Sequence, residues 1–256
     1  MTDLAKCTWP EANALFGPRT IAILPVGSTE PHGPHLPLDT DVTIALAMAR
    51  RAEQRLESLS IPTLVLPALA YGLTNYTSGF AGRITLRSGT LWMVLEDIVT
   101  SLEQQGVTRI VFANAHLEPE HVAVLRGVVL DHAVRGADKA QVLFPDNTRR
   151  RFADTLGAEF KSGDCHAGRY ESSLVLAADP SSVREKERAS LPPVEIHLIE
   201  KMKAGMNSFQ QMGADRAYCG DPAAATANEG RDLVESLSEM LVISMREAWP
   251  DVFATA

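Results

Sequence analysis

Short apolar runs alternate with longer amphipathic segments through most of this chain, and this alternation most restricts the fold. Four runs are predicted to be buried strands: 20–26 (TIAILPV), 63–66, 109–113 (RIVFA) and 140–144. Four segments with helical periodicity or composition are predicted to be helices: 42–59, 89–105, 118–135 and 228–249. Alternation of this kind predicts an α/β fold, a three-layer αβα arrangement with a mostly parallel sheet, in one domain over residues 1–256.

Two polar segments of the sequence are expected to form loops. Residues 27–40 are rich in Gly, Pro and His, and residues 70–89 are rich in Gly, Thr, Ser and Asn. A loop as long as the second one is usually functional or contains a hairpin. Ligands of parallel sheets bind beyond the carboxyl ends of the strands, so the segments that follow strands 20–26 and 109–113 are the first places to look for a site.

Charge and cysteine content exclude several classes of protein. The formal net charge of −8 disfavours binding to a phosphate backbone, and the densest basic run, Arg149 to Arg151, is interpreted as a solvated helix start. The spacing of Cys7, Cys165 and Cys219 matches no zinc finger and no redox pair. No apolar stretch is long enough for a bilayer span and the first residues do not resemble a signal peptide, so we expect a cytoplasmic protein without membrane or nucleic-acid partners.

Metal-binding and catalytic residue types gather in the loop after the first strand, GSTEPHGPHLPLDTD. It contains Glu30, His32, His35, Asp39 and Asp41. In an extended segment, residues i and i+2 point the same way, so a carboxylate at 30 and an imidazole at 32 can face one site. Asp41 lies at a predicted helix start, where the backbone N–H groups favour its ionised form.

A second cluster, NAHLEPEH, follows the strand at 109–113. His116 and Glu118 are again two residues apart; Glu120 is the alternative carboxylate, and His121 is expected on the exposed face of the helix. An Asp shared by two divalent ions, with one His and one Glu on each side, is a sensible two-metal arrangement, and N/O ligands without thiolate suit Zn²⁺ or Mn²⁺.

A third cluster, GDCHAGRYESS, supplies candidates for proton transfer. His166 is a candidate general acid or base, while Glu171 is either a further ligand or a group that orients His166. Cys165 and His166 are adjacent, so their side chains point apart in a strand, which disfavours a cysteine nucleophile.

The sequence resembles the creatininase (creatinine amidohydrolase) family. Three stretches carry the resemblance: LPVGSTEPHGPHLPLDTD (24–41), NAHLEP (114–119) and DCHAGRYESS (164–173); a weaker match is YGLTNYTSGFAGRITL (71–86). The resemblance implies a creatininase-like fold, a binuclear Zn/Mn site, hydrolysis of a C–N amide bond that is often cyclic, and a homo-oligomer, commonly a hexamer.

The resemblance also implies roles for individual residues. Glu30, His32, Asp41 and His116 match metal ligands, with Asp41 as the bridge, and Glu118 matches the Glu ligand of creatininase itself. The implied terminal pairs are Glu30 with His116 and His32 with Glu118. His166 matches the histidine that carries the proton to the leaving nitrogen, and Glu171 the acidic residue that supports the site.

Departures from the family pattern concern the substrate. The tryptophans, at 9, 92 and 249, lie outside the regions expected to form the pocket, and Leu117 stands where creatininase has tyrosine. Arg83 replaces a threonine, and a cation there could hold a substrate carboxylate. Candidate substrate-binding residues are Arg83, Thr74, Leu117 and Cys165. We therefore expect the chemistry to persist with a substrate other than creatinine.

Several functions follow from these patterns. The first is hydrolysis of a small, cyclic or carboxylate-bearing amide, in which a hydroxide shared by two metal ions attacks the carbonyl. Formamide deformylation and peptide processing are alternatives within the family. From other classes, a non-catalytic metal- or ligand-binding protein is disfavoured because all five candidate ligands and His166 are present, and a phosphoesterase because no Gly-rich phosphate loop occurs.

Overall fold

The computed structural model describes residues 2–136 and 139–254. Its sheet has four parallel strands in the order β2-β1-β3-β4. Their bounds are β1 (Ile21–Val26), β2 (Thr63–Val65), β3 (Arg109–Asn114) and β4 (Gln141–Leu143). The four strands predicted from apolar runs are thus confirmed, with ends that differ by at most one residue. Parallel pairing explains the runs, because strands covered on both faces need apolar residues at successive positions.

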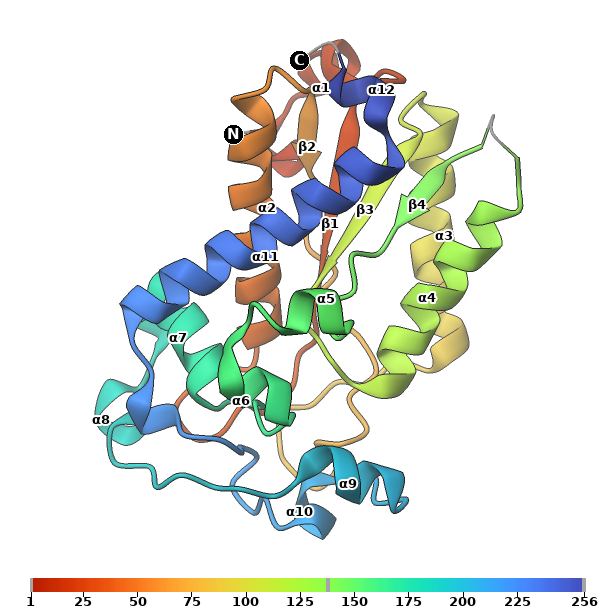
Figure 1. Ribbon diagram of the computed structural model, residues 1–256. Helices are drawn as coiled ribbons and strands as arrows, with labels where there is room; N and C mark the ends of the chain where they lie inside the picture. Colours follow the sequence, from red (N-terminus) through yellow and green to blue (C-terminus); the bar gives the residue numbers. More distant parts are fainter. Residues whose placement is uncertain (1, 137–138, 255–256) are drawn as a thin grey trace.

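Helices cover both faces of the sheet (Figure 1). The long helices are α2 (Thr40–Glu57), α3 (Ser88–Gln104), α4 (Pro119–Ala133), α7 (Arg169–Ala178) and α11 (Ala227–Ala248). The short helices are α1 (Trp9–Leu15), α5 (Arg150–Ala153), α6 (Gly157–Ser162), α8 (Glu185–Arg188), α9 (Leu198–Lys203), α10 (Phe209–Met212) and α12 (Pro250–Phe253). The 3₁₀ turns are η1 (Leu4–Lys6), η2 (Pro180–Ser182) and η3 (Pro222–Ala224). The predicted α/β arrangement is confirmed.

Alternate residues of β1 and β3 enter two separate apolar cores. Ile21 and Ile23 of β1 pack with α2, α7 and α11, whereas Ala22 and Leu24 pack with α3 and α4. The period of two along a strand directs neighbouring side chains to opposite faces. Because both cores are anchored on the same strands, the carboxyl ends of β1 and β3 are held in a fixed relation to the helices that begin there.

A close approach of backbone to backbone fixes the start of α2. A Cβ atom on Gly27, the residue after β1, would lie 2.6 Å from the backbone nitrogen of Val42. No real Cβ tolerates that distance, so only glycine allows the end of β1 to meet the first turn of α2. This contact brings Asp41 to the carboxyl end of the sheet.

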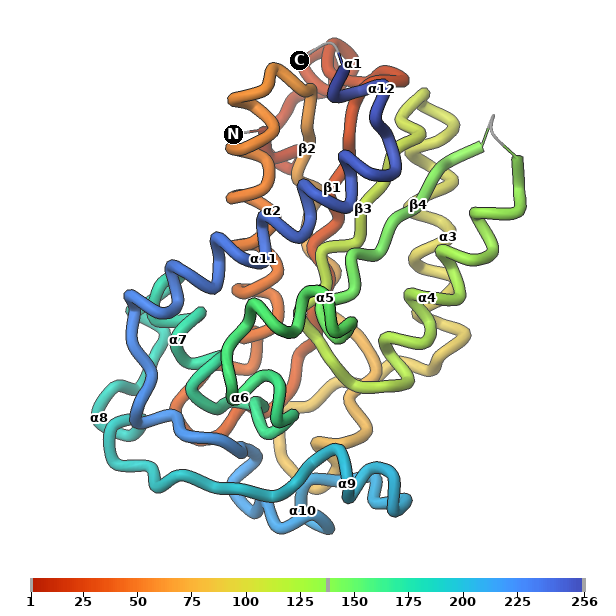
Figure 2. Tube along the Cα trace, viewed as in Figure 1, coloured from red at the N-terminus to blue at the C-terminus, as the bar shows by residue number. Residues whose placement is uncertain are grey.

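The long loop between β2 and α3 forms no hairpin. It contains isolated bridges that join Thr29 to Ile84 and Gly72 to Thr85, and it crosses the carboxyl edge of the sheet. Figure 2 shows this loop at the same end of the molecule as α6, α9 and α10, while α12 lies at the opposite end. Among the described residues, no helix has the length and apolar character needed to cross a membrane.

Candidate metal centre

Three segments that are distant in the sequence meet beyond the carboxyl ends of β1 and β3. The loop after β1 and the first turn of α2 supply one group of residues, and the loop after β3 supplies another. The turn before α7 and the first turn of that helix complete the set. The side chains are all buried: Glu30, His32, Asp41, His116, Glu118, His166 and Glu171. The predicted clustering of these residues at one edge of the sheet is thus observed in the structure.

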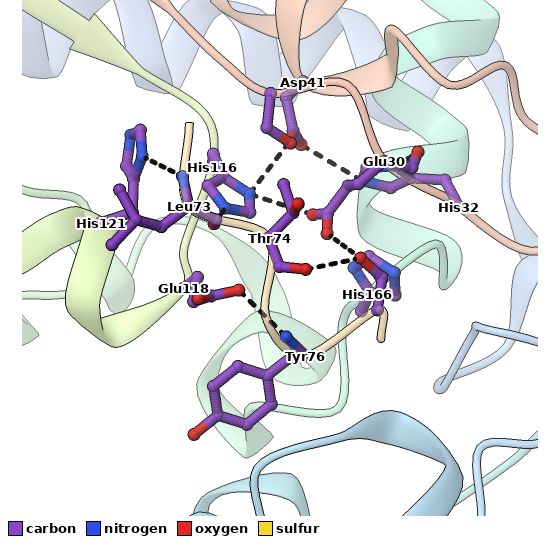
Figure 3. Close-up of polar contacts among 12 residues, drawn as sticks. Glu30, His32, Asp41, Leu73, Thr74, Tyr76, His116, Glu118, His121 and His166 are labelled. Carbon is purple, nitrogen blue, oxygen red and sulfur yellow. Dashed lines mark hydrogen bonds and ion pairs between the residues drawn. The ribbon is translucent and has the colours of Figure 1, made fainter. Parts of the chain in front are cut away.

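Glu30, Asp41 and His116 form one group of potential ligands (Figure 3). His116 Nδ1 lies 3.0 Å from Glu30 Oε1 and 3.0 Å from Asp41 Oδ2. Outer groups hold the two carboxylates in place. Thr77 Oγ1 donates to Glu30 Oε2 at 3.0 Å, and Ser28 Oγ donates to Asp41 Oδ2 at 2.7 Å.

His32, Asp41 and Glu171 form a second group on the other side of Asp41. His32 Nε2 lies 3.2 Å from Asp41 Oδ1 and 3.5 Å from Glu171 Oε2. The two oxygens of Asp41 therefore face different groups. This is the arrangement expected of a carboxylate shared by two cations.

The second nitrogen of each ring binds a backbone carbonyl. His32 Nδ1 lies 3.1 Å from the oxygen of Glu30, and His116 Nε2 lies 2.5 Å from the oxygen of Leu73. A carbonyl oxygen only accepts, so these nitrogens carry the hydrogens and the other nitrogen of each ring faces the cluster. Metal-binding histidines are characteristically oriented in this way.

Charges in the cluster shift its acid–base equilibria strongly. Burial opposes ionisation of Asp41, but the imidazoles of His32 and His116 hold the pKa of its carboxyl group well below the usual range. Burial likewise opposes protonation of His32, yet the Asp41 carboxylate raises the pKa of that ring to about 10. Burial raises the pKa of Glu171 to about 7. Protons on the neighbouring rings thus offset the charge of Asp41, whereas Glu171 itself binds a proton more readily than an ordinary carboxylate.

Divalent cations fit this donor set. His32 Nε2 is buried without a well-oriented hydrogen-bond partner, although a carboxylate oxygen is 3.2 Å away. Buried charges are normally paired or bound to metal, and mixed imidazole and carboxylate donors suit Zn²⁺ or Mn²⁺. The donors therefore fit two cations that share Asp41.

The structure changes the partner predicted for His32. That partner is Glu171, 3.5 Å away, rather than Glu118, which belongs to neither group that shares Asp41. Glu118 precedes α4, and its Oε2 accepts from the backbone nitrogen of Tyr76 at 3.2 Å. Its Oε1 is buried without a hydrogen-bond partner and the residue lines the adjoining cavity. A ligand role for Glu118 stays a prediction.

His166 lies beside the cluster in a neutral form. Its Nε2 lies 3.0 Å from the carbonyl oxygen of Pro31, so this nitrogen carries the hydrogen and Nδ1 is left free to accept a proton. Burial, together with the nearby His32 ring, lowers the pKa of His166 to about 4. The ring stacks on Phe209, with centroids 4.3 Å apart. Glu171 was predicted to be either a further ligand or the group that orients His166; its Oε2 accepts from the nitrogen of Ala167 at 2.6 Å and lies 3.5 Å from His32 Nε2, which favours the ligand role.

A cavity of about 520 Å³ opens onto the cluster. Glu30, Asp41, His116, His166 and Glu171 form its polar floor. The wall is largely apolar and includes these side chains: Leu117, Phe160, Leu198, Ile199, Met202 and Phe209. A cavity of this size accommodates a ligand well beyond a single small ring.

The predicted substrate-binding residues divide into two pairs. Leu117 and Cys165 line the cavity, and burial raises the pKa of the Cys165 thiol well above its ordinary value, so this residue is an inert wall group. Arg83 and Thr74 are not among the lining residues, and Arg83 Nη1 donates to the carbonyl oxygen of Thr74 at 3.1 Å.

Two features near the centre were not anticipated from the sequence. The cations that line the cavity are Arg150 and Lys161; Arg150 begins α5 with a side chain that is 96% exposed, as expected of a solvated helix start, and it pairs with Asp154. The expectation that His121 is exposed is wrong. His121 is fully buried, and its Nε2 lies 3.0 Å from Asn114 Oδ1 while Nδ1 accepts from the nitrogen of Leu73 at 3.4 Å. It thereby helps to hold Leu73, the residue whose carbonyl oxygen contacts His116.

The family model for creatinine amidohydrolase matches residues 5–244. The chain belongs to the creatininase family. The resemblance inferred from the three sequence motifs is confirmed. Members of the creatininase family with known activity include amidohydrolases and peptidases, both of them hydrolases.

Relatives with assigned names fall into two groups. The mycofactocin precursor peptide peptidase of Mycobacterium tuberculosis (strain CDC 1551 / Oshkosh) is 34% identical over 222 residues, which cover 84% of this chain and 80% of the relative. The peptidase of the same name from Mycolicibacterium smegmatis is 30% identical and covers 90% of this chain and 86% of the relative. The creatinine amidohydrolase of Pseudomonas putida is 27% identical, and the match covers 77% of this chain and 81% of the relative.

Solved creatininases share the fold of this chain. A creatininase structure with Mn superposes with a TM-score of 0.73 at 23% identity and covers 97% of this chain and 99% of the other. A mutant creatininase of the Zn-Zn type superposes equally well, with a TM-score of 0.73 at 22% identity and coverage of 97% and 98%. The creatininase-like fold predicted from the sequence is thereby confirmed.

Proposed function

We propose that this protein is a two-metal amidohydrolase that cleaves a C–N bond in a peptide or a peptide-derived amide. The observation that carries the proposal is Asp41, whose two oxygens face two separate groups of buried donors at the floor of one cavity. Glu30 and His116 would hold one cation, and His32 and Glu171 the other. Two divalent cations at such a centre supply an activated water and polarise a carbonyl group.

The side chains supply the remaining steps of hydrolysis. Nδ1 of the neutral His166 accepts a proton as water adds to the amide carbonyl, while its Nε2–H stays bound to Pro31. The same ring then delivers that proton to the departing nitrogen, since an amine leaves an amide only after it is protonated. The stacked Phe209 ring keeps His166 at the edge of the cavity and excludes water from one of its faces.

Similarity and cavity shape favour a peptide over a small ring. The mycobacterial peptidases are more similar to this chain, at 30–34% identity, than the Pseudomonas creatinine amidohydrolase is at 27%. The cavity walls are mainly apolar, and Lys161 and Arg150, rather than Arg83, line the cavity and offer positive charge for a substrate carboxylate. A small cyclic amide is the second candidate, supported by the solved creatininases of the same fold.

Hydrolysis of a substrate panel tests this function. The metal-depleted protein is assayed with Mn²⁺, with Zn²⁺ and without metal against short peptides, creatinine and other cyclic amides. Metal-dependent cleavage of peptides is expected, and creatinine is expected to be a poor substrate. Asp41→Asn should lose both cations in elemental analysis, because both groups share this residue; two retained equivalents would refute the shared-ligand assignment. A homo-oligomeric, single-domain, cytoplasmic enzyme remains our prediction.

A further inference from the structure

Helix α9 stands apart from the two main cores and faces the metal centre across the cavity. Leu198, Ile199 and Met202 line the cavity from this helix, and Phe160 and Phe209 extend the same surface. We call these five residues the α9 wall. Ile199 is 43% exposed although it lines a cavity. An exposed apolar surface inside a concavity is typical of a ligand-binding face.

The α9 wall is continuous with the reacting groups. Phe209 belongs to the wall and stacks on His166 with a centroid separation of 4.3 Å and an interplanar angle of 24°. A group that packs on the wall therefore lies next to the atoms at which the amide bond breaks. The position of the wall is consequently suited to distinguish substrates by the residue beside the scissile bond.

Asp164 fastens this wall to the segment that carries His166. Its Oδ2 accepts from the backbone nitrogens of Ile196 at 2.7 Å and His197 at 2.9 Å, and its Oδ1 accepts from the nitrogen of Leu198 at 2.7 Å. Hydrogen bonds to a buried carboxylate are among the stronger ones in proteins. They hold His197 in a left-handed conformation, φ 55°, that a residue other than glycine seldom adopts.

Besides Asp164, a small set of contacts fixes α9, among them a hydrogen bond from Lys201 Nζ to the carbonyl oxygen of Met212. The helix has six residues and packs in a small apolar cluster with Phe209 and Met212, separate from the cores on the sheet. Ile199 is seated on Gly163, where a Cβ would meet its Cγ1 at 2.6 Å. Helices this short are not stable by themselves, so the position of α9, and with it the part of the wall formed by Leu198, Ile199 and Met202, depends on Asp164.

We propose that the α9 wall binds a large apolar group of the substrate beside the scissile C–N bond, and that Asp164 is the positioning residue that holds the wall in place. This inference depends on the proposed function of the protein as a metal-dependent hydrolase. It narrows the substrate to amides that carry an aliphatic or aromatic side chain next to the bond that is cut. Asp164 acts through α9 and does not itself contact the reacting atoms.

Two hydroxamates that differ only in their tails test the proposal. Acetohydroxamate and 3-phenylpropionohydroxamate carry the same metal-binding head, and their dissociation constants are measured by calorimetry on the Mn²⁺-loaded protein. Burial of the phenyl tail is expected to tighten binding by roughly 10-fold to 100-fold. The double variant I199A/M202A should lose most of this ratio and bind acetohydroxamate as the wild type does.

Asp164 variants separate positioning from folding. Asp164→Ala should bring the ratio of the two affinities close to one with an unchanged metal content, and Asp164→Asn, which keeps one accepting oxygen, should restore part of it. Met93→Ala on the outer face of α3 is the matched control, since Met93 is 59% exposed and does not line the cavity. A wild-type ratio below twofold, or a ratio preserved in I199A/M202A, overturns the proposal whether or not Asp164→Ala folds. Binding of neither hydroxamate would refute the metal-dependent hydrolase itself, and this inference with it.

Discussion

Replacement of Ser28 by alanine should weaken the binding of both cations at once. Ser28 is fully buried, and its hydroxyl donates to Asp41 Oδ2 at 2.7 Å. A hydrogen bond to a charged group contributes about 1.5–3 kcal/mol, and loss of an outer partner of a metal ligand typically costs about 10-fold to 100-fold in metal affinity. The two ranges agree, because tenfold corresponds to about 1.4 kcal/mol.

A comparison with Thr77→Val makes this expectation specific. Thr77 donates to Glu30 Oε2 at 3.0 Å, and Glu30 belongs to only one of the two groups that share Asp41. The variant S28A should therefore weaken the binding of two equivalents of Mn²⁺. Thr77→Val should weaken the binding of one equivalent and leave the affinity for the other near its wild-type value. Activity of both variants should recover at saturating metal, since neither residue belongs to the predicted ligands or to the proton-transfer group.

Titration of metal-depleted protein with Mn²⁺ in the presence of a competing chelator measures the two affinities. Ser238→Ala is the matched control, because Ser238 is also fully buried but bonds only the carbonyl oxygen of Glu235 on α11. Its metal affinities should equal those of the wild type. If S28A binds both equivalents within twofold of the wild type, the contribution of the Ser28 hydrogen bond to metal binding through Asp41 is refuted.

Other substitutions test the remaining parts of the structure. His166→Asn should retain both cations and lose roughly 10²-fold to 10⁴-fold in kcat. His197→Asn, which changes an exposed ring, should leave kcat unchanged. Equal kcat values in the two variants would show that His166 takes no part in proton transfer. Gly230→Ala places a Cβ 1.8 Å from the carbonyl oxygen of Ser173, which forces α11 away from α7, and should lower the midpoint of thermal unfolding by roughly 2–10 °C. Gly89→Ala is the control: a Cβ there would meet nothing within 4 Å, so this variant should leave the midpoint of unfolding unchanged or raise it. If the midpoint of Gly230→Ala equals that of the wild type, the close packing of α11 on α7 is contradicted.

The parts of the centre that sequence reasoning predicted are local ones. Glu30, His32 and Asp41 lie within twelve residues of one another, and the strand before them is recognisable from its apolar residues. His116 follows the neighbouring strand in the same way. Parallel strands bring their carboxyl ends to one edge, so the meeting of these two segments could be predicted without coordinates.

Relations across long sequence distances were harder to predict. The spacing of His116 and Glu118 placed both in one site, but Glu118 turns toward the nitrogen of Tyr76, and Glu171 approaches His32 instead. The orientation of a carboxylate at a helix start depends on which loop packs beside it, and that loop is more than forty residues away in the chain. His121 was misplaced for the same reason, since the loop around Leu73 covers it.

By itself, then, the sequence determined the α/β class, the family and the residue types of the candidate metal centre, because apolar periodicity and ligand spacing are local properties of the chain. Only the tertiary structure decided that Asp41 faces two groups of donors, that Glu171 completes one of them, and that α9 closes the cavity opposite. These relations arise from packing between segments that no local pattern connects. Asp164 is the clearest example: one carboxylate that gathers three backbone N–H groups from a segment more than thirty residues further along the chain.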